Sequence, residues 1–359
     1  MSIFKELSIL YLLVVFFIFK YNVFMKIEYK VKENEKNINE ILKDTFHISS
    51  RLCGKLKKNH CLKIIRTNQT AKHSESNSTI SKSNNNIIQN TSENRNPNVL
   101  HYGDVLIIDL DYEEDTSNII SVNKPLKTLY EDEFVLAVNK PAFMPVHPSM
   151  NHFTDSLSNI VRAYFDKNGI HKKTRPVNRL DRNTSGIVVF SKNEYVQEML
   201  IQEMKSHKFV KKYIAFVYDN NLPDEGIIKK PIGRKAGSIM ERTINKNELM
   251  SGYKMEDAIT KYKVLKRVNG IAKVECNLLT GRTHQIRLHF DSIGCPLVGE
   301  TLYNHSLAQF LDKNKISTEI LSFPRQALHC SEISFDEPLT SKKIDITSSL
   351  PDDMMILEK

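Results

Sequence analysis

Apolar residues alternate or run together in short stretches along most of the chain, a pattern typical of a sheet with a few helices. Alternation over residues 26–33 and a β-branched run over residues 186–190 predict strands. Further strands are predicted over residues 105–110, 134–138, 209–218, 258–264 and 271–279. Apolar positions at helical spacing predict amphipathic helices over residues 154–166 and 194–206. This mixed order of strands and helices favours an α+β fold.

The N-terminal region predicts a small module of its own. The opening strand is followed by apolar residues at helical spacing over residues 37–46. A second short helix is expected to start from an N-cap at Ser49 or Ser50. A strand over residues 61–65 comes next, and the strand over residues 105–110 would close the module.

Two stretches of unusual composition interrupt this pattern. Residues 67–98 hold nine Asn and six Ser without apolar periodicity, which predicts a disordered insertion because too little apolar surface is available to offset ordering entropy. Residues 7–19 form an apolar run of 13 residues, shorter than the about 20 that span a bilayer, and no small-residue cleavage site follows. We interpret residues 1–25 as an apolar leader or a mis-assigned start, with a membrane anchor as the alternative.

Length, charge and cysteine content narrow the class of protein. The 359 residues suffice for one large domain and one smaller one. A net charge of +9 favours a polyanionic partner, because Lys and Arg that neutralise phosphates release counterions. Five cysteines without a CxxC pair fit neither a disulfide framework nor a structural zinc site, and they favour a reducing cytoplasm.

A charged segment leads directly into the strand predicted over residues 186–190. Asp181 lies between Arg179 and Arg182 at the entrance of this strand. Opposite charge would hold the carboxylate ionised and make it a competent nucleophile or base. The alternative is a surface loop with an ordinary ion pair, worth about 0 to 1 kcal/mol.

A second polar segment follows the turn at residues 280–281. If residues 282–290 are extended, Arg287 faces polar neighbours and becomes a candidate partner for a distant carboxylate. His284 and His289 would then lie on opposite faces, so they would not form a ready-made metal pair.

Three motifs in this order resemble those of the RluA-type family of RNA pseudouridine synthases. They read VNKPAFMPVHP, NRLDRNTSG and GRTHQIRLHF, and the resemblance runs from about residue 126 to the C-terminus. It implies a pseudouridine synthase fold, with a central, mostly antiparallel mixed sheet and a cleft across it. It also implies an enzyme that isomerises specific uridines in RNA, with large-subunit ribosomal RNA as the expected substrate.

The resemblance also implies a domain organisation. Residues 26–112 are expected to form an S4-like RNA-binding module with the insertion at residues 67–98, residues 113–125 a linker, and residues 126–359 the catalytic domain. Basic residues cluster in the second helix and the strand after it, as an RNA-binding module requires. A solvated basic helix is the alternative reading of that cluster.

The matching motifs imply roles for individual side chains. Asp181 would be the essential carboxylate, acting on the sugar C1′ or removing the 2′ proton, and both routes stay open. Arg287 would pair with Asp181, and Tyr213 would stack on the base once the uridine is flipped out of the RNA. Further substrate contacts are expected from Arg179, Ile286, Leu288, Lys140 and Arg282.

The reaction breaks the bond from N1 to C1′ and rejoins the base through C5 without redox change, so no nucleotide or metal cofactor is expected. The partner is RNA, and the protein is expected to act as a monomer. Three residues depart from the family pattern, namely Asn178 in place of His, Asp219 in place of Gly and Glu300 in place of Asp. Asn178 motivates a rival hypothesis, a non-catalytic RNA-binding or ribosome-assembly factor that retains the fold. Asp219 and Glu300 are expected to be peripheral to the chemistry.

Overall fold

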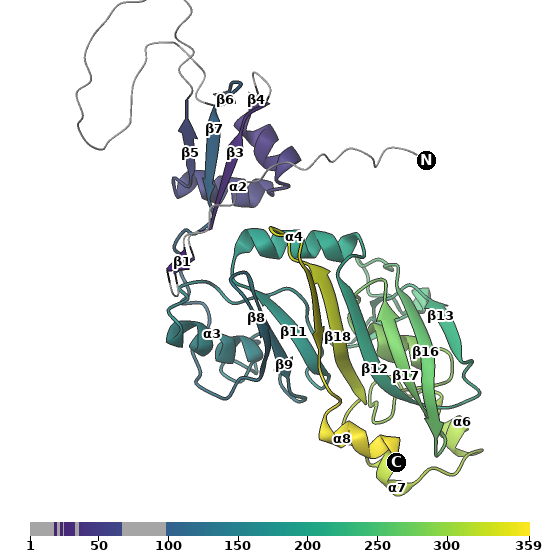
Figure 1. Ribbon diagram of the computed structural model, residues 1–359. Coiled ribbons are helices and arrows are strands. Elements are labelled where there is room, and N and C mark those ends of the chain that lie inside the picture. The colour runs from purple at the N-terminus through teal and green to yellow at the C-terminus, as the bar shows by residue number, and fades with distance from the viewer. Residues whose placement is uncertain (1–17, 20–21, 24, 33–35, 67–97) are drawn as a thin grey trace, which may run out of the picture. The chain divides into compact units, whose positions relative to one another are not determined.

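The chain folds into two compact units. A computed structural model describes residues 18–19, 22–23, 25–32, 36–66 and 98–359. The first unit comprises Met1–Tyr112 and the second Glu113–Lys359 (Figure 1). The insertion predicted over residues 67–98 lies outside the described residues except for its last position, as does most of the apolar run over residues 7–19.

The N-terminal unit contains a three-stranded antiparallel sheet. The central strand is β7 (Val105–Asp109), which pairs with β3 (Lys26–Lys30) and with β5 (Leu62–Ile65). A second pair joins β4 (Lys36–Asn37) to β6 (Val99–Leu100), and β1 (Ile18–Phe19) pairs with β2 (Asn22–Val23). Strands that are far apart in the sequence of this unit therefore pair with one another in one sheet.

Two short helical segments cover this sheet. The first consists of α1 (Ile38–Glu40) and a π-helical turn over Ile41–Thr45. The second is α2 (Ser50–Lys58), whose first turn is capped by the Ser49 hydroxyl, which accepts the Leu52 N–H at 3.2 Å. Fully buried apolar side chains from both layers form the core: Ile27, Leu42, Leu52, Leu56, Leu106 and Ile108. The predicted N-cap at Ser49 is confirmed, whereas the S4-like identity of the module stays a prediction.

A large mixed sheet forms the C-terminal unit (Figure 1). Its strands run in the order β13, β16, β17, β12, β18, β11, β9 and β8, with β10 paired to β11 and β19 paired to β18. Their bounds are β8 (Thr128–Glu131), β9 (Val135–Lys140), β10 (Arg175–Pro176), β11 (Ser185–Ser191), β12 (Val210–Tyr218), β13 (Glu225–Lys229), β16 (Ile259–Val268), β17 (Ile271–Leu278), β18 (Leu328–Asp336) and β19 (Lys343–Thr347). The predicted α+β class with a mostly antiparallel sheet is confirmed.

One pairing in this sheet is parallel and places β18 between β11 and β12. Ser185 pairs with His329 and Gly186 with Cys330 in that parallel register. Gly186 has φ of 117°, and a Cβ there would meet the Cys330 carbonyl oxygen at 2.3 Å, so only glycine permits this close approach. The chain therefore inserts a late strand between two earlier ones.

Helices flank the sheet at its faces and ends. The predicted amphipathic helices correspond to α3, capped by Ser156, and to α4, capped by Asn193. The helices of this unit are α3 (Leu157–Lys167), α4 (Glu194–Lys205), α5 (Gln285–Asp291), α6 (Leu307–Leu311), α7 (Thr318–Leu321) and α8 (Asp352–Met355). Shorter elements are β14 (Gly233–Arg234) paired with β15 (Arg242–Thr243), and 3₁₀ turns over Lys246–Glu248 and Ile356–Glu358.

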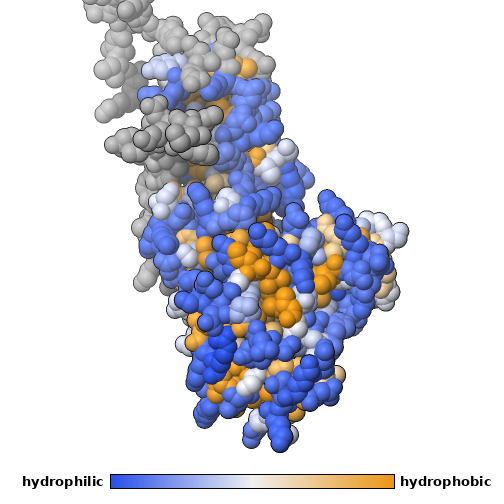
Figure 2. Space-filling view, turned by 90° about the vertical axis from the view of Figure 1, so that its right-hand side faces the viewer, coloured by the Kyte–Doolittle hydropathy of each residue, from blue (hydrophilic) through white to orange (hydrophobic). Residues whose placement is uncertain are grey.

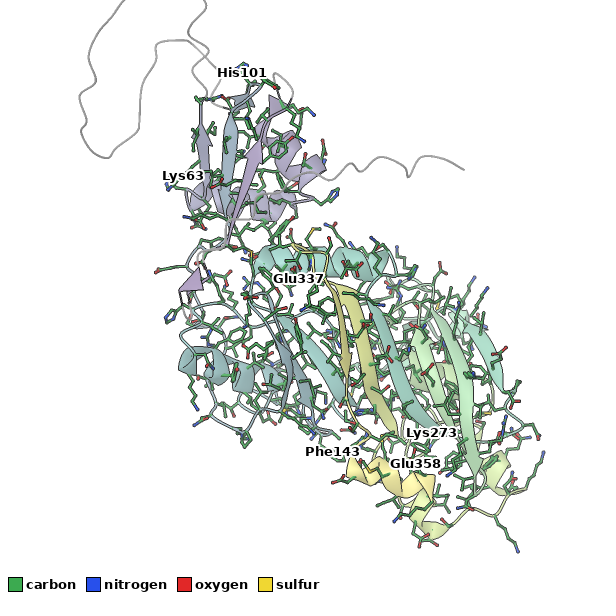
Figure 3. All side chains as sticks on the ribbon, viewed as in Figure 1. Lys63, His101, Phe143, Lys273, Glu337 and Glu358 are labelled. Carbon is green, nitrogen blue, oxygen red and sulfur yellow. The ribbon has the colours of Figure 1, made fainter. Side chains whose placement is uncertain are left out.

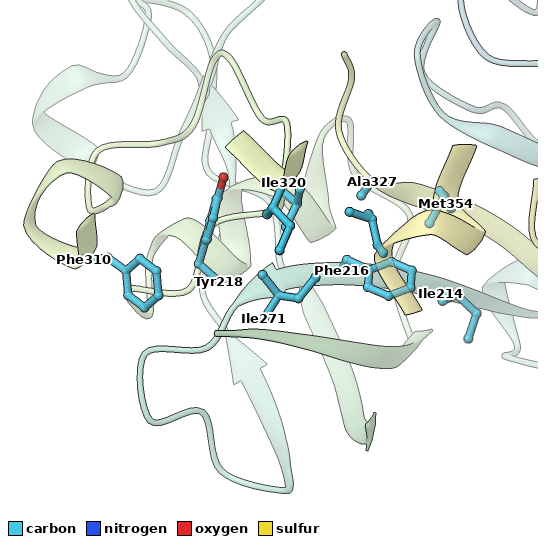
Figure 4. Packing of buried hydrophobic residues seen from close by; sticks show 10 residues of the cluster. Ile214, Phe216, Tyr218, Ile271, Phe310, Ile320, Ala327 and Met354 are labelled. Atoms are coloured by element: carbon cyan, nitrogen blue, oxygen red, sulfur yellow. The ribbon is translucent and has the colours of Figure 1, made fainter. Parts of the chain in front are cut away.

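One face of β12 is buried against the C-terminal segment. Ile214, Phe216 and Tyr218 pack with residues of α6, α7 and α8 in a single apolar cluster (Figure 4). Lys273 of β17 points toward Glu358 near the chain end, and the two form an ion pair (Figure 3). Because strand residues alternate between faces, the odd-numbered residues of β12 face the opposite side of the sheet.

The surface of the described residues is largely hydrophilic, with apolar side chains gathered in limited patches on the face shown in Figure 2. All five cysteines belong to the described residues and carry free thiols. Within that part of the chain, no helix combines the length and apolar composition needed to cross a membrane.

Candidate active site

Asp181 lies in a turn that is tied to the strand after it. Asn178 is buried, and its side-chain amide donates to the Ile187 carbonyl at 3.0 Å and accepts the Val189 N–H at 2.9 Å. The Thr184 N–H donates to the Asp181 carbonyl at 3.0 Å and closes the turn. Asn178 therefore acts as a clamp between this segment and β11, which explains its burial without a role in chemistry.

Two buried cations, Lys140 and Arg325, donate hydrogen bonds to main-chain carbonyls of this turn. The Lys140 ammonium donates to the Arg182 carbonyl at 3.0 Å and to the Pro141 and Met144 carbonyls at 2.8 and 2.7 Å. Arg325 donates to the Asn183 carbonyl at 3.2 Å. The turn that carries Asp181 is thus fixed by hydrogen bonds that leave its carboxylate free to face the pocket.

The prediction that Lys140 contacts RNA is wrong. Its side chain is completely buried, because the ammonium turns inward to bond three carbonyls. Burial lowers the pKa of Lys140 to about 7, while the negative charge of Asp181 opposes that fall. Lys140 is therefore a positioning residue for the Asp181 turn.

Replacing Lys140 with methionine should lower both stability and turnover. Each buried carbonyl left without a donor costs about 1 to 3 kcal/mol, so the melting temperature should fall and the Asp181 turn should loosen. The control is Lys192→Met, which removes a lysine bonded to the Asp132 carbonyl at 2.6 Å elsewhere in the unit. Thermal unfolding and the kcat of the folded fraction should separate the two variants. A Lys140→Met enzyme with wild-type kcat would contradict the positioning role.

Arg287 comes from a helix, so the prediction of an extended segment over residues 282–290 is wrong. His284 adopts a left-handed conformation with φ of 59°, and α5 begins at the next residue. The Gln285 side chain stabilises this turn, since its oxygen accepts from the Thr280 hydroxyl at 2.9 Å and the Arg282 N–H at 3.0 Å. All seven residues of α5 are buried. The spacing of its polar and apolar residues therefore does not show the one apolar face that is typical of an amphipathic helix.

The Arg287 guanidinium lies between two carboxylates that come from distant segments. Its Nη1 is 3.1 Å from Asp181 Oδ2, so the expected contact across 106 positions of sequence is present. Its Nε and Nη2 are 2.6 and 2.7 Å from the two oxygens of Glu300. Burial disfavours the charged guanidinium, yet the hydrogen bonds and charge of Glu300, with that of Asp181, raise the pKa of Arg287 above its usual value.

Glu300 is not peripheral, contrary to the sequence-based expectation. Its side chain is completely buried and also accepts the N–H groups of Thr301 and Leu302 at 3.0 and 2.8 Å. The preceding Gly299 has φ of 69°, and a Cβ there would meet the Arg325 carbonyl oxygen at 2.0 Å. This glycine turn presents Glu300 to Arg287 in a bidentate geometry that fixes the guanidinium plane.

A pocket opens beside this ion-pair chain. It is lined by six of the residues that the sequence singles out, namely Arg179, Asp181, Tyr213, Arg282, Ile286 and Arg287. Leu288 and Lys140 do not line it. Leu288 packs instead in a core cluster with Ile232, Ala258 and Tyr303, so the prediction that it walls the pocket is wrong.

Tyr213 is buried and lines the pocket, on the face of β12 opposite the C-terminal cluster. Burial raises the pKa of Tyr213 well above its usual value. The ring is therefore a neutral phenol near pH 7, which suits stacking on a base better than proton removal as a phenolate.

His284 also lines the pocket, although sequence analysis gave it no role. Its Nδ1 is 2.8 Å from the Tyr303 hydroxyl, and its Nε2 is 3.9 Å from Asp181 Oδ2. The Tyr303 hydroxyl also accepts the Arg242 N–H at 2.8 Å, so it links the His284 ring to the backbone of β15. Burial lowers the pKa of His284, which keeps the ring neutral. The left-handed turn before α5 brings it here, and the linear sequence gives no signal of that turn.

The two outer arginines of the pocket differ in their surroundings. Arg179 is exposed. Arg282 is paired with Glu256 at 2.8 Å and donates to the Asp257 carbonyl at 3.0 Å. Arg282 is exposed as well, but it is held by these two contacts.

Comparisons with known proteins relate the chain to RNA pseudouridine synthases. Residues 134–292 match the family described as RNA pseudouridylate synthase. The chain is 34% identical over 261 residues to "Uncharacterized RNA pseudouridine synthase YjbO" of Bacillus subtilis (strain 168), covering 73% of this chain and 85% of that protein. It is also 34% identical over 248 residues to "Ribosomal large subunit pseudouridine synthase D" of Blochmanniella floridana, covering 67% and 74%. A solved structure, "Human RNA Pseudouridylate Synthase Domain Containing 4", shares the fold with a TM-score of 0.50 at 20% identity, covering 64% of this chain and 90% of that one.

Proposed function

Because this chain belongs to the RluA-type family of RNA pseudouridine synthases, we propose that it isomerises specific uridines of large-subunit ribosomal RNA through Asp181. Relatives from Blochmanniella floridana and Zymomonas mobilis, at 34% and 33% identity, are named for that substrate. The single observation that carries the site assignment is the chain of contacts from Asp181 through Arg287 to Glu300 at the pocket.

Asp181 is the reacting carboxylate in this proposal. It either attacks C1′ as the bond to N1 breaks, or removes the 2′ proton so that a glycal forms. Both routes need the carboxylate held at a fixed distance from the ribose, and the Arg287 guanidinium supplies that orientation. Positioning of this kind contributes about 7 to 11 kcal/mol to lowering a barrier.

The target uridine must leave the RNA stack to reach Asp181. Extruding a base costs on the order of a few kcal/mol, and less in loops and bulges. The buried Tyr213 ring offers a stacking surface for the flipped uracil, and Ile286 adds an apolar wall. The exposed Arg179 is suited to enter the space that the base leaves.

Affinity for RNA would come from positive charge outside the pocket. The chain carries a net charge of +9. The last turn of α2 in the N-terminal unit contains Lys55, Lys57 and Lys58, which supports the S4-like RNA-binding role proposed for residues 26–112. The five free thiols support a reducing compartment, and we place the enzyme in the cytoplasm.

The residue that suggested the rival hypothesis, a non-catalytic RNA-binding factor, no longer supports it. It rested on Asn178, and that side chain is engaged in two hydrogen bonds to β11. The departure at this position therefore concerns the anchoring of the turn rather than the reacting carboxylate.

Mapping of pseudouridines tests the substrate. Chemically labelled RNA would be sequenced from a strain lacking the gene, and from the same strain carrying the wild-type gene or the Asp181→Asn variant. We expect one or a few sites in large-subunit ribosomal RNA to lose pseudouridine, and only the wild-type gene to restore them. Loss confined to another RNA would reject the proposed substrate. Persistence of every site would favour the non-catalytic factor.

A further inference from the structure

The two faces of β12 have different surroundings. Ile214 and Phe216 point into the cluster with the C-terminal helices. Strand alternation places Lys211 and Tyr213 on the opposite face, and Tyr213 lines the pocket. Lys211 therefore projects from the catalytic face of the sheet, two positions before Tyr213.

Lys211 does not line the pocket itself, but two residues that line it are its neighbours in the sheet. Leu278, its neighbour on β17 by the antiparallel register, lines the pocket, as does Tyr213. The Lys211 Nζ lies 3.2 Å from the point that a Cβ on Gly281 would occupy, in the turn that precedes α5. The absence of a side chain at Gly281 leaves room for the ammonium beside the pocket.

The Lys211 ammonium makes no hydrogen bond or ion pair with any residue that the structure describes. Burial lowers the pKa of Lys211, and among the described residues the Cys330 thiol has the opposite, smaller effect on that pKa. The adjacent Lys212 contrasts with it, since its ammonium is 3.0 Å from Glu332 on the other face. A partly desolvated cation without an acceptor costs free energy, and such groups concentrate at functional sites.

We propose that Lys211 is a substrate-contacting residue whose ammonium binds an anionic oxygen of the flipped nucleotide. This inference rests on the proposed function and deepens it, because it assigns the position beside Tyr213 to recognition of negative charge. The acceptor missing in the free protein is then supplied by the RNA.

Two oxygens of the substrate have the required charge. One belongs to the phosphate next to the target nucleotide, where an ammonium adds affinity and releases a counterion. The other belongs to the uracil, because the electron pair of the broken bond from N1 to C1′ moves onto the base and spreads to its carbonyl oxygens. A cation in a dry site stabilises such developing charge strongly.

The test compares Lys211→Met with Lys211→Arg and with the matched control Lys212→Met. The substrate is total RNA from a strain lacking the gene, labelled with tritium at C5 of uridine, so that tritium release reports turnover. We expect Lys211→Met to lose about 10²-fold or more in kcat/KM, Lys211→Arg to recover part of it, and Lys212→Met to resemble the wild type. The Lys211→Met protein should melt at or above the wild-type temperature, because it no longer desolvates an unpaired charge.

The kinetic parameters separate the two oxygens. A fall in kcat with unchanged salt dependence would assign Lys211 to the uracil, whereas a rise in KM with a salt slope reduced by about 0.7 would assign it to a phosphate. Equal kcat/KM for Lys211→Met and Lys212→Met would overturn the inference while the proposed function stands. An unfolded Lys211→Met protein would also overturn it, since Lys211 would then serve the fold. Absence of turnover by the wild-type enzyme would overturn both the proposed function and the role of Lys211.

Discussion

Replacing Asp181 with asparagine is expected to abolish pseudouridine formation while RNA binding persists. An amide carries no negative charge, so it can neither attack C1′ nor remove the 2′ proton. Its oxygen can still accept the hydrogen bond that Arg287 donates at 3.1 Å, so the local fold should survive. Loss of a reacting group of this kind reduces turnover by about 10⁴-fold or more. Tritium release from labelled RNA measures turnover, and filter binding measures affinity.

The matched control for this variant is Asp224→Asn. Asp224 is also a carboxylate paired with an arginine, but its side chain is 84% exposed and lies outside the pocket. Its replacement should leave kcat within about twofold of the wild type, since exposed ion pairs contribute only about 0 to 1 kcal/mol. Turnover by Asp181→Asn at the level of Asp224→Asn would reject the proposed role of Asp181.

The second large effect is expected at Glu300. The variant Glu300→Gln leaves the buried Arg287 with half of its counter-charge and removes one side of the bidentate contact. Removing one partner of a buried ion pair costs about 3 to 5 kcal/mol, so the free energy of unfolding should fall by that amount. The guanidinium should also lose its fixed orientation toward Asp181, so kcat should fall more than KM rises.

Two further variants separate charge from position at this site. Glu300→Asp keeps the carboxylate on a shorter side chain and should restore part of the stability and of kcat. Glu332→Gln removes a carboxylate that is 33% exposed and paired with Lys212, so it should change stability by no more than about 1 kcal/mol. Wild-type stability and kcat in Glu300→Gln would show that Arg287 does not depend on Glu300.

The catalytic unit is well predicted where the residue pattern and the environment agree. The run over residues 186–190 becomes β11 because it is apolar throughout and completely buried in a large sheet. The contact between Asp181 and Arg287 could be predicted from the sequence because the motifs follow one another in the order typical of the family. The placement of Tyr213 on a strand facing the pocket follows from the same order and from strand alternation.

Other features depend on long-range packing that local patterns do not report. The helix α5 is short and buried on every side, so its alternating residues gave a false strand signal. The same limit explains Lys140, because a lysine at the end of an apolar strand is usually exposed, and one of its three carbonyl acceptors, that of Arg182, comes from a segment 42 positions away. The role of Glu300 required knowledge of the glycine turn that directs it inward.

The late insertion of β18 has a consequence for protein synthesis. The strand that carries Tyr213 and the strand next to Asp181 do not pair with each other, because β18 lies between them. A nascent chain that has not yet delivered Leu328–Asp336 from the exit tunnel therefore cannot assemble the two halves of the pocket. The chain must therefore be synthesised past Asp336 before the polypeptide can modify RNA, including the RNA of the ribosome that is making it.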